Sequence, residues 1–86
     1  MWEVFLSPDV QDFLDKQDSN IAERIRKGLK KLEIEDPFHY IEHLESHDYY
    51  KYRIGHYRAL IEIDFENKLL KVQILDHRKK IYKRKH

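Results

Sequence analysis

The sequence contains no cysteine, which excludes a disulfide framework, a thiol nucleophile and any cysteine-ligated zinc site. Glycine and proline are also scarce, with 2 of each, and this argues against disorder and low complexity. No apolar run approaches the roughly 18 residues of a membrane span. The N-terminus lacks the basic and then apolar layout of a signal peptide. We therefore expect a soluble protein of the cytoplasm.

The chain is short, but it has enough apolar residues for one core. Of its 86 residues, 41% are hydrophobic and 13% are aromatic. A second core would need roughly 50 more residues. We expect residues 1–86 to form a single domain.

Charge is abundant and is segregated along the chain. Charged residues make up 38% of the sequence, yet the net charge is only +1. Residues 1–50 hold 6 Lys and Arg against 12 Asp and Glu, a balance of −6, and residues 51–86 hold 11 against 4, a balance of +7. Such segregation favours contact between the C-terminal part and a polyanion. The alternative is a solvated surface whose charges cancel across the fold.

The chain begins with the pattern of a short strand and a helix. Residues 2–6 are β-prone. Ser7 and Pro8 then provide an N-cap and a first-turn proline for a helix over residues 8–16.

A second helix follows directly. Asn20 and Glu23 fit a capping box at its start. The helix should end near residues 33–36, because Pro37 disfavours helix at the residue before it. The apolar positions expected to face inward from the two helices are Val10, Phe13, Leu14, Ile21, Ala22, Ile25, Leu29 and Leu32.

From residue 49 the apolar period changes to two, which predicts strands. Gly55 and His56 fit a two-residue hairpin turn, and Glu66 and Asn67 are the candidates for the next turn. These turns place Ile54 opposite Tyr57, Arg53 opposite Arg58, Ile63 opposite Leu70, Glu62 opposite Lys71, Ile61 opposite Val72 and Ala59 opposite Ile74. The pattern predicts an α+β fold, β-α-α-β-β-β, in which an antiparallel sheet carries the N-terminal helical hairpin on one face and the first strand joins the sheet.

The first hairpin brings three cations to the sheet face away from the helices. Arg53 lies opposite Arg58, and Lys51 is two residues from Arg53 on the same face. Opposed guanidinium groups repel each other, which does nothing for folding, whereas a multiply charged anion would be held by them. The alternative is that a nearby acid such as Glu62 neutralises the pair.

His77 and the basic segment behind it extend this candidate site. By strand alternation His77 should lie near the same face, where it could act as a general acid or base, although a structural role is the plainer alternative. Tyr82 could stack on a base or donate a hydrogen bond to a phosphate. The cations of this segment are Arg78, Lys79, Lys80, Lys83, Arg84 and Lys85.

No motif in the sequence indicates a metal or a cofactor. His39, His43 and His47 would line one face of a continuous helix, but Pro37 precedes them and the stretch is loop-like. HExxH, Walker, GxGxxG and GxSxG motifs are absent. We expect neither a metal nor a cofactor.

Two stretches carry a family resemblance. Residues 50–59 read YKYRIGHYRA, with a basic strand and the motif R-x-G-x-Y-R. Residues 76–82 read DHRKKIY and close on H-R-x-x-[IV]-Y. Together, at this spacing, they resemble the RelE/ParE superfamily of toxins from toxin–antitoxin systems. The likeness covers almost the whole chain and implies a RelE-like fold, similar to that of microbial ribonucleases.

The resemblance implies a ribosome-dependent endoribonuclease that cuts mRNA in the A site and so inhibits translation. The 2′-hydroxyl would attack the adjacent phosphate, and a cyclic phosphate and a 5′-hydroxyl would result. The matching catalytic candidates are Lys51, Arg53, Arg58, His77, Arg78 and Tyr82. The residues expected to bind RNA are Lys51, Arg53, Arg58, Lys79, Lys80, Lys83 and Arg84.

The roles that the resemblance implies differ from residue to residue. Arg58, in the Gly-x-Tyr-Arg motif, would stabilise negative charge on the pentacoordinate phosphate. Lys51 would help to deprotonate the 2′-hydroxyl or hold the developing charge, whereas Arg53 is a poor base. Arg78 would bind phosphate or protonate the leaving oxygen, and His77 is an additional acid–base candidate.

The expected partners are a cognate antitoxin protein that folds on binding, the ribosome and its mRNA. Two alternatives stay open. One is a ParE-like inhibitor of DNA gyrase, which shares the fold but cuts no RNA. The other is a catalytically inactive relative that binds the antitoxin.

Overall fold

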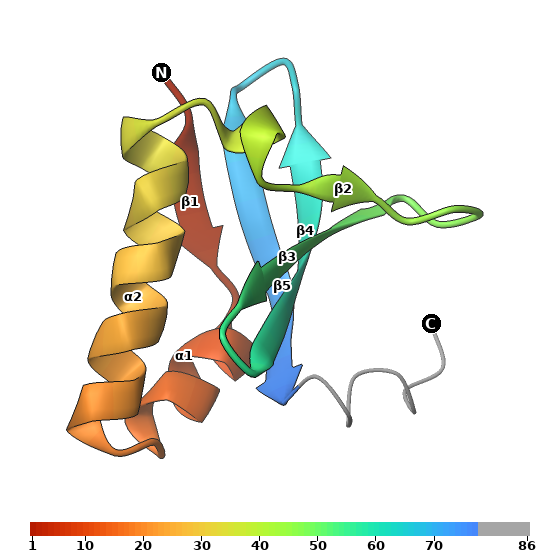
Figure 1. Ribbon diagram of the computed structural model, residues 1–86. Helices are drawn as coiled ribbons and strands as arrows, with labels where there is room; N and C mark the ends of the chain where they lie inside the picture. The colour runs from red at the N-terminus through yellow and green to blue at the C-terminus, as the bar shows by residue number, and fades with distance from the viewer. Residues whose placement is uncertain (78–86) are drawn as a thin grey trace.

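Two helices and five strands make up the computed structural model, which describes residues 1–77. The elements in chain order are β1 (Glu3–Leu6), α1 (Pro8–Asp15), α2 (Ser19–Ile34), the 3-10 turn η1 (Pro37–His39), β2 (Glu42–His43), β3 (Tyr49–Ile54), β4 (Tyr57–Asp64) and β5 (Leu69–His77). The strands form one sheet in the order β1-β5-β4-β3-β2, with α1 and α2 on one side of it (Figure 1). The predicted α+β class and element order are confirmed, with β2 as an additional short strand.

The sheet is mixed, because β1 runs parallel to β5 while every other neighbouring pair is antiparallel. A wholly antiparallel sheet was expected, so this detail is corrected. Parallel neighbours need a long crossover, and the two helices together with the β3–β4 hairpin provide it. The alternation of a four-residue strand predicts which side chains face inward but not the direction of its neighbour.

Local capping explains where the helices begin and end. Ser7 caps α1 as predicted, since its Oγ accepts the Val10 N–H at 3.2 Å. The capping box predicted at Asn20 is wrong: α2 starts at Ser19, after an extended Asp18 whose carbonyl accepts the Ala22 N–H at 2.9 Å. Asn20 is therefore already inside the first helical turn. The predicted end of the helix is confirmed, because α2 ends at Ile34.

The core lies between the helices and one face of the sheet. Its buried side chains include Val10, Leu14, Ile25, Leu29, Leu32, Ala59, Ile61, Leu70 and Val72. Gly28 lets the sheet approach α2 closely, and the Tyr52 hydroxyl donates a hydrogen bond to the Gly28 carbonyl at 2.7 Å. This bond joins the middle of β3 to the middle of α2.

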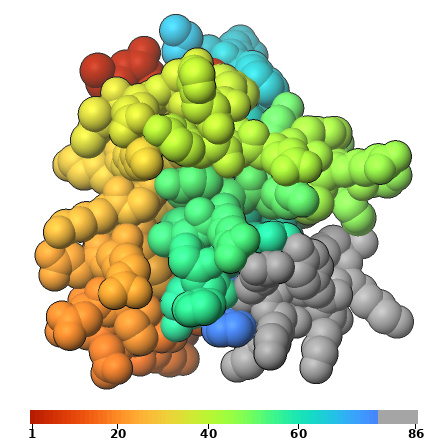
Figure 2. All heavy atoms as spheres, in the orientation of Figure 1, coloured from red at the N-terminus to blue at the C-terminus, as the bar shows by residue number. Residues whose placement is uncertain are grey.

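Three aromatic rings from distant segments close one end of the core. Trp2 precedes β1, Phe38 lies in η1 and Phe65 follows β4. The Trp2 ring centroid is 5.4 Å from that of Phe38 and 6.0 Å from that of Phe65, with edge-to-face geometry. At another edge, the connection between β2 and β3 projects from the body of the molecule (Figures 1 and 2).

The β3–β4 hairpin has the predicted register. Ile54 pairs with Tyr57 and Arg53 pairs with Arg58 across a two-residue turn. Gly55 takes φ 59°, in the left-handed region that favours glycine. The faces of β3 and β4 are therefore as expected.

The β4–β5 hairpin follows the predicted register for only half its length. The pairs formed by Ile63, Glu62 and Ile61 are confirmed. Ala59 pairs with Leu75 rather than with Ile74, because the register shifts between Leu60 and Ile61 and β5 holds one extra residue there. This β-bulge, at Gln73, reverses the facing of every later residue of β5.

Residues 1–77 include no helix that is both long enough and apolar enough to cross a bilayer.

Candidate nucleic-acid interface

Three of the predicted site residues come together on the sheet face opposite the helices. Lys51 and Arg53 lie on β3, and Arg58 lies on β4 directly across from Arg53. Their neighbours Tyr52, Ile54 and Ala59 point the other way and are buried in the core. We call Lys51, Arg53 and Arg58 the cationic face.

The three cations differ in exposure and in contacts. Arg53 is exposed, and its Nε donates to the Gly55 carbonyl at 3.2 Å, which directs the side chain toward the hairpin turn. The Lys51 ammonium lies 3.7 Å from a carboxylate oxygen of Glu42 on β2. That pair is partly solvated and holds the lysine weakly. Arg58 is only 8% exposed.

Asp76 is the residue of this face that the sequence analysis missed. The bulge turns it toward the cationic face, directly opposite Arg58 in the β4–β5 register, and it too is only 8% exposed. Its Oδ1 accepts the His77 N–H at 2.7 Å. The expected alternative partner, Glu62, instead pairs across the strands with Lys71 and lies 3.5 Å from the Gln73 amide. The acid beside the arginines is thus Asp76.

His77 does not lie on the cationic face, so the placement predicted by strand alternation is wrong. It pairs with Tyr57, and its ring is 5.7 Å from the Tyr57 ring and 6.2 Å, nearly parallel, from the His56 ring. Tyr57 in turn packs edge to face on Phe13 of α1. The bulge at Gln73 is the cause, since it exchanges the facings of His77 and Asp76.

The remaining predicted residues lie outside the described part of the chain. They are Arg78, Lys79, Lys80, Tyr82, Lys83 and Arg84. Their proposed catalytic and RNA-binding roles stay predictions.

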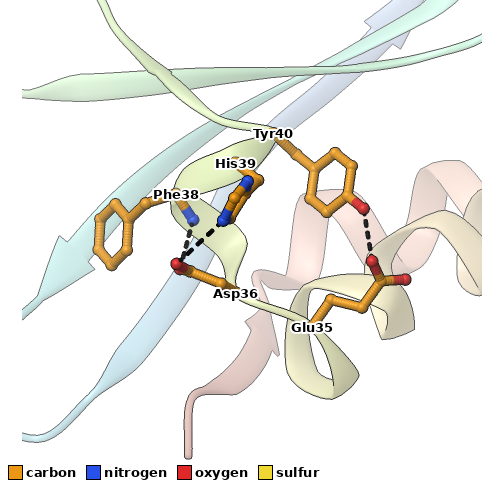
Figure 3. Close-up of polar contacts among 5 residues, drawn as sticks. All are labelled: Glu35, Asp36, Phe38, His39 and Tyr40. Atoms are coloured by element: carbon orange, nitrogen blue, oxygen red, sulfur yellow. Dashed lines mark hydrogen bonds and ion pairs between the residues drawn. The ribbon is translucent and has the colours of Figure 1, made fainter.

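A second polar cluster surrounds η1, where α2 leads into β2 (Figure 3). Asp36 accepts the Phe38 N–H at 3.1 Å and lies 3.5 Å from Nε2 of His39. The Tyr40 hydroxyl donates to Glu35, and this bond raises the pKa of Tyr40. These contacts join neighbours in sequence, so the cluster shapes a turn.

Within residues 1–77 no group of three or more His, Asp or Glu side chains is arranged to hold a metal ion. His39 lies in η1 and His43 lies in β2, so they do not share the continuous helix on which a row of ligands would depend.

Two helices cover one face of the sheet, and the cationic face lies on the other. RelE toxins of known structure share this small α+β fold. The chain is similar to the RelE–RelB complex structures of three organisms. For RelBE2 of Mycobacterium tuberculosis the TM-score is 0.77 at 22% identity, covering 90% of this chain and 98% of the other. For the RelE–RelB complex of Pyrococcus horikoshii the TM-score is 0.73 at 23% identity, covering 90% of this chain and 94% of the other. For that of Methanococcus jannaschii the TM-score is 0.71 at 21% identity, covering 95% of this chain and 99% of the other. At these identities the likeness shows the fold.

The family follows from the sequence match. Residues 4–82 match the family described as the ParE toxin of the type II toxin–antitoxin system parDE. The chain therefore belongs to the ParE toxin family, within the RelE/ParE superfamily that the sequence motifs resemble. No curated protein matches the chain.

Proposed function

We propose that this toxin is a ribosome-dependent endoribonuclease that cleaves mRNA in the A site, in the cytoplasm. The observation that supports this most is the direct opposition of Arg53 and Arg58, with Lys51 on the same face. One acid, Asp76, lies across from Arg58, so the two opposed arginines keep an excess of positive charge that an anion would offset. Arginine binds phosphate through paired N–H donors, and lysine adds a point charge.

The proposed reaction forms a bond from the 2′-oxygen to phosphorus and breaks the bond from phosphorus to the 5′-oxygen. Arg58 stabilises the charge that develops on the phosphate oxygens. Arg53 binds the same phosphate from the exposed side of the hairpin. Lys51 assists transfer of the 2′-hydroxyl proton to water, and water returns a proton to the leaving 5′-oxygen. The products are a cyclic phosphate and a 5′-hydroxyl.

The proposal includes a cognate antitoxin as partner. Each of the three similar structures is a complex of a RelE toxin with a RelB antitoxin. A cationic sheet face suits a partner segment that carries acidic residues and folds on binding.

Incubating ribosomes programmed with a defined mRNA with the purified protein tests the proposal. We expect cleavage in the A site, and a loss of roughly 100-fold or more on Arg58→Ala. The matched control is Arg24→Ala, which removes an equal charge from an exposed position of α2 and should leave cleavage unchanged. Intact mRNA with the wild-type protein would contradict the proposal.

Gyrase inhibition is the second candidate, because the description of the matched family names the ParE toxin. If the protein inhibits gyrase, DNA supercoiling by gyrase should be lost while the mRNA stays intact. Absence of both effects, with retained antitoxin binding, would instead indicate an inactive relative.

A further inference from the structure

The β4–β5 register places Asp76 directly across from Arg58, the one residue of the cationic face that lies on β4. We infer that Asp76 is a positioning residue that holds the Arg58 guanidinium in the orientation needed to bind the phosphate under attack. The inference rests on the proposed endoribonuclease function and adds a residue to that site.

The geometry and the burial support this role. Arg58 and Asp76 are cross-strand partners, so their Cβ atoms are about 5 Å apart. Each residue is only 8% exposed. A buried charge is unfavourable unless an opposite charge or hydrogen bonds compensate it. Two opposite charges buried as direct neighbours therefore orient each other.

The carboxylate of Asp76 is itself held in place. One of its oxygens accepts the backbone N–H of His77 at 2.7 Å. Because His77 is the last residue of β5, this bond anchors the Asp76 side chain to the end of the strand. A fixed carboxylate restricts the arginine beside it more than a mobile one would.

The donors of arginine allow both contacts at once. The guanidinium carries five N–H donors in a planar fork, and a carboxylate uses at most two of them. A guanidinium can therefore bind a carboxylate and a phosphate at the same time. Asp76 would thus restrict the orientation of the Arg58 guanidinium without preventing it from binding a phosphate. A guanidinium that is already oriented lowers the activation free energy of cleavage.

This role separates catalysis from binding. Asp76→Asn removes one negative charge from the face, so RNA should bind at least as tightly as it does to the wild type. The rate constant kcat should fall by roughly 10- to 100-fold, because the guanidinium is no longer held in place. A purely structural role would instead change the melting temperature and leave kcat per folded molecule intact.

The experiment measures kcat and KM on programmed ribosomes for the wild type, Asp76→Asn, Asp76→Glu and Glu62→Gln. Glu62→Gln is the matched control, because it removes the same charge from the same face of β4 at a position opposite Lys71. We expect wild-type kcat for Glu62→Gln, a reduced kcat without a higher KM for Asp76→Asn, and an intermediate kcat for Asp76→Glu. Wild-type kcat in Asp76→Asn would overturn the inference.

A double-mutant cycle covers the case in which Asp76→Asn folds poorly. In an Arg58→Ala background the buried arginine is already gone, so Asp76→Ala does not leave its charge uncompensated. If Asp76 acts through Arg58, this second substitution should cause no further loss of kcat. Additive losses would overturn the inference, because they would show that Asp76 acts independently of Arg58.

One spectroscopic readout does not depend on cleavage. The Nη–H resonances of Arg58, assigned with Arg58→Lys, should exchange slowly with solvent in the wild type and rapidly in Asp76→Asn, whereas the buried Nε–H, which makes no hydrogen bond within residues 1–77, serves as the internal reference. If wild-type protein leaves mRNA intact, the proposed function fails while this signal still reports the positioning. Equal exchange in both proteins would refute it.

Discussion

At the scale of single residues, Gly55 sets the geometry on which the cationic face depends. Its φ of 59° closes the two-residue turn that places Arg53 opposite Arg58. An L-residue with a Cβ is strained in this region. We expect Gly55→Ala to lower the free energy of unfolding by about 1–2 kcal/mol, measured by urea denaturation. Gly55→Asn is the matched comparison and should cost less, since asparagine tolerates this conformation. Equal losses would contradict the argument.

Because of Tyr52, the free energy of unfolding should depend on pH in the alkaline range. Burial is the main cause that raises its pKa above the ordinary value of 10.0, followed by the nearby charges of Tyr40 and Glu35. The folded state therefore keeps this proton at a pH at which the unfolded chain loses it. Stability contributed by the protonated hydroxyl is complete below pH 10 and is lost as the pH rises through the folded-state pKa.

Replacing Tyr52 by phenylalanine checks this. We expect a shallower fall in the free energy of unfolding above pH 10 than in the wild type, together with a loss of about 1 kcal/mol at neutral pH from the missing bond to Gly28. The measurement is urea denaturation at a series of pH values. The same alkaline slope in both proteins would count against a buried, protonated Tyr52.

At the scale of the elements, Ser7 joins the start of α1 to the bulged strand. Its Oγ accepts the Val10 N–H at 3.2 Å and donates to the Gln73 carbonyl at 3.0 Å. We expect Ser7→Ala to lower the unfolding free energy by about 1–2 kcal/mol, because both bonds are lost. Ser19→Ala, at the exposed start of α2, is the control and should cost less than about 0.5 kcal/mol. Thermal or urea denaturation measures both, and equal losses would refute the capping role.

The bulge in β5 decides which side chains join the site. Without it, His77 would share the face of Arg58 and Asp76 would point toward the helices. Alternation could not reveal this, because Ile74 and Leu75 are both apolar and either could face the core. The core accepts Leu75, which is 4% exposed.

At the scale of the whole molecule, segregated charge matters more than the net charge of +1. Each phosphate neutralised on a single strand contributes roughly 0.7 to the slope of log affinity against log salt. We expect Lys51→Gln and Arg53→Gln each to reduce this slope by about that amount for a single-stranded RNA. Lys30→Gln, on the opposite helical layer, is the control and should leave it unchanged. Fluorescence anisotropy at several salt concentrations measures the slopes, and a uniform decrease in all three variants would argue against a localised RNA site.

Much of the fold and part of the site could be predicted from the sequence. Local sequence patterns predict the α1 cap, the end of α2 and the β3–β4 register, because these features depend on contacts between residues close in sequence. The start of α2 was predicted two residues late, because several residues near Asp18 are able to cap a helix. The direction of β1 depends on a crossover from one end of the chain to the other, which no local pattern specifies.

The amino-acid order alone determined the segregation of charge, the two amphipathic helices and the opposition of Arg53 and Arg58, because periodicity and a glycine turn act over a few residues. Only the tertiary structure decided that β1 pairs with β5 and that Asp76, rather than His77, lies beside Arg58. The physical reason is that packing of the whole core selects which of two adjacent apolar residues faces inward, and that choice sets the facing of every residue after it.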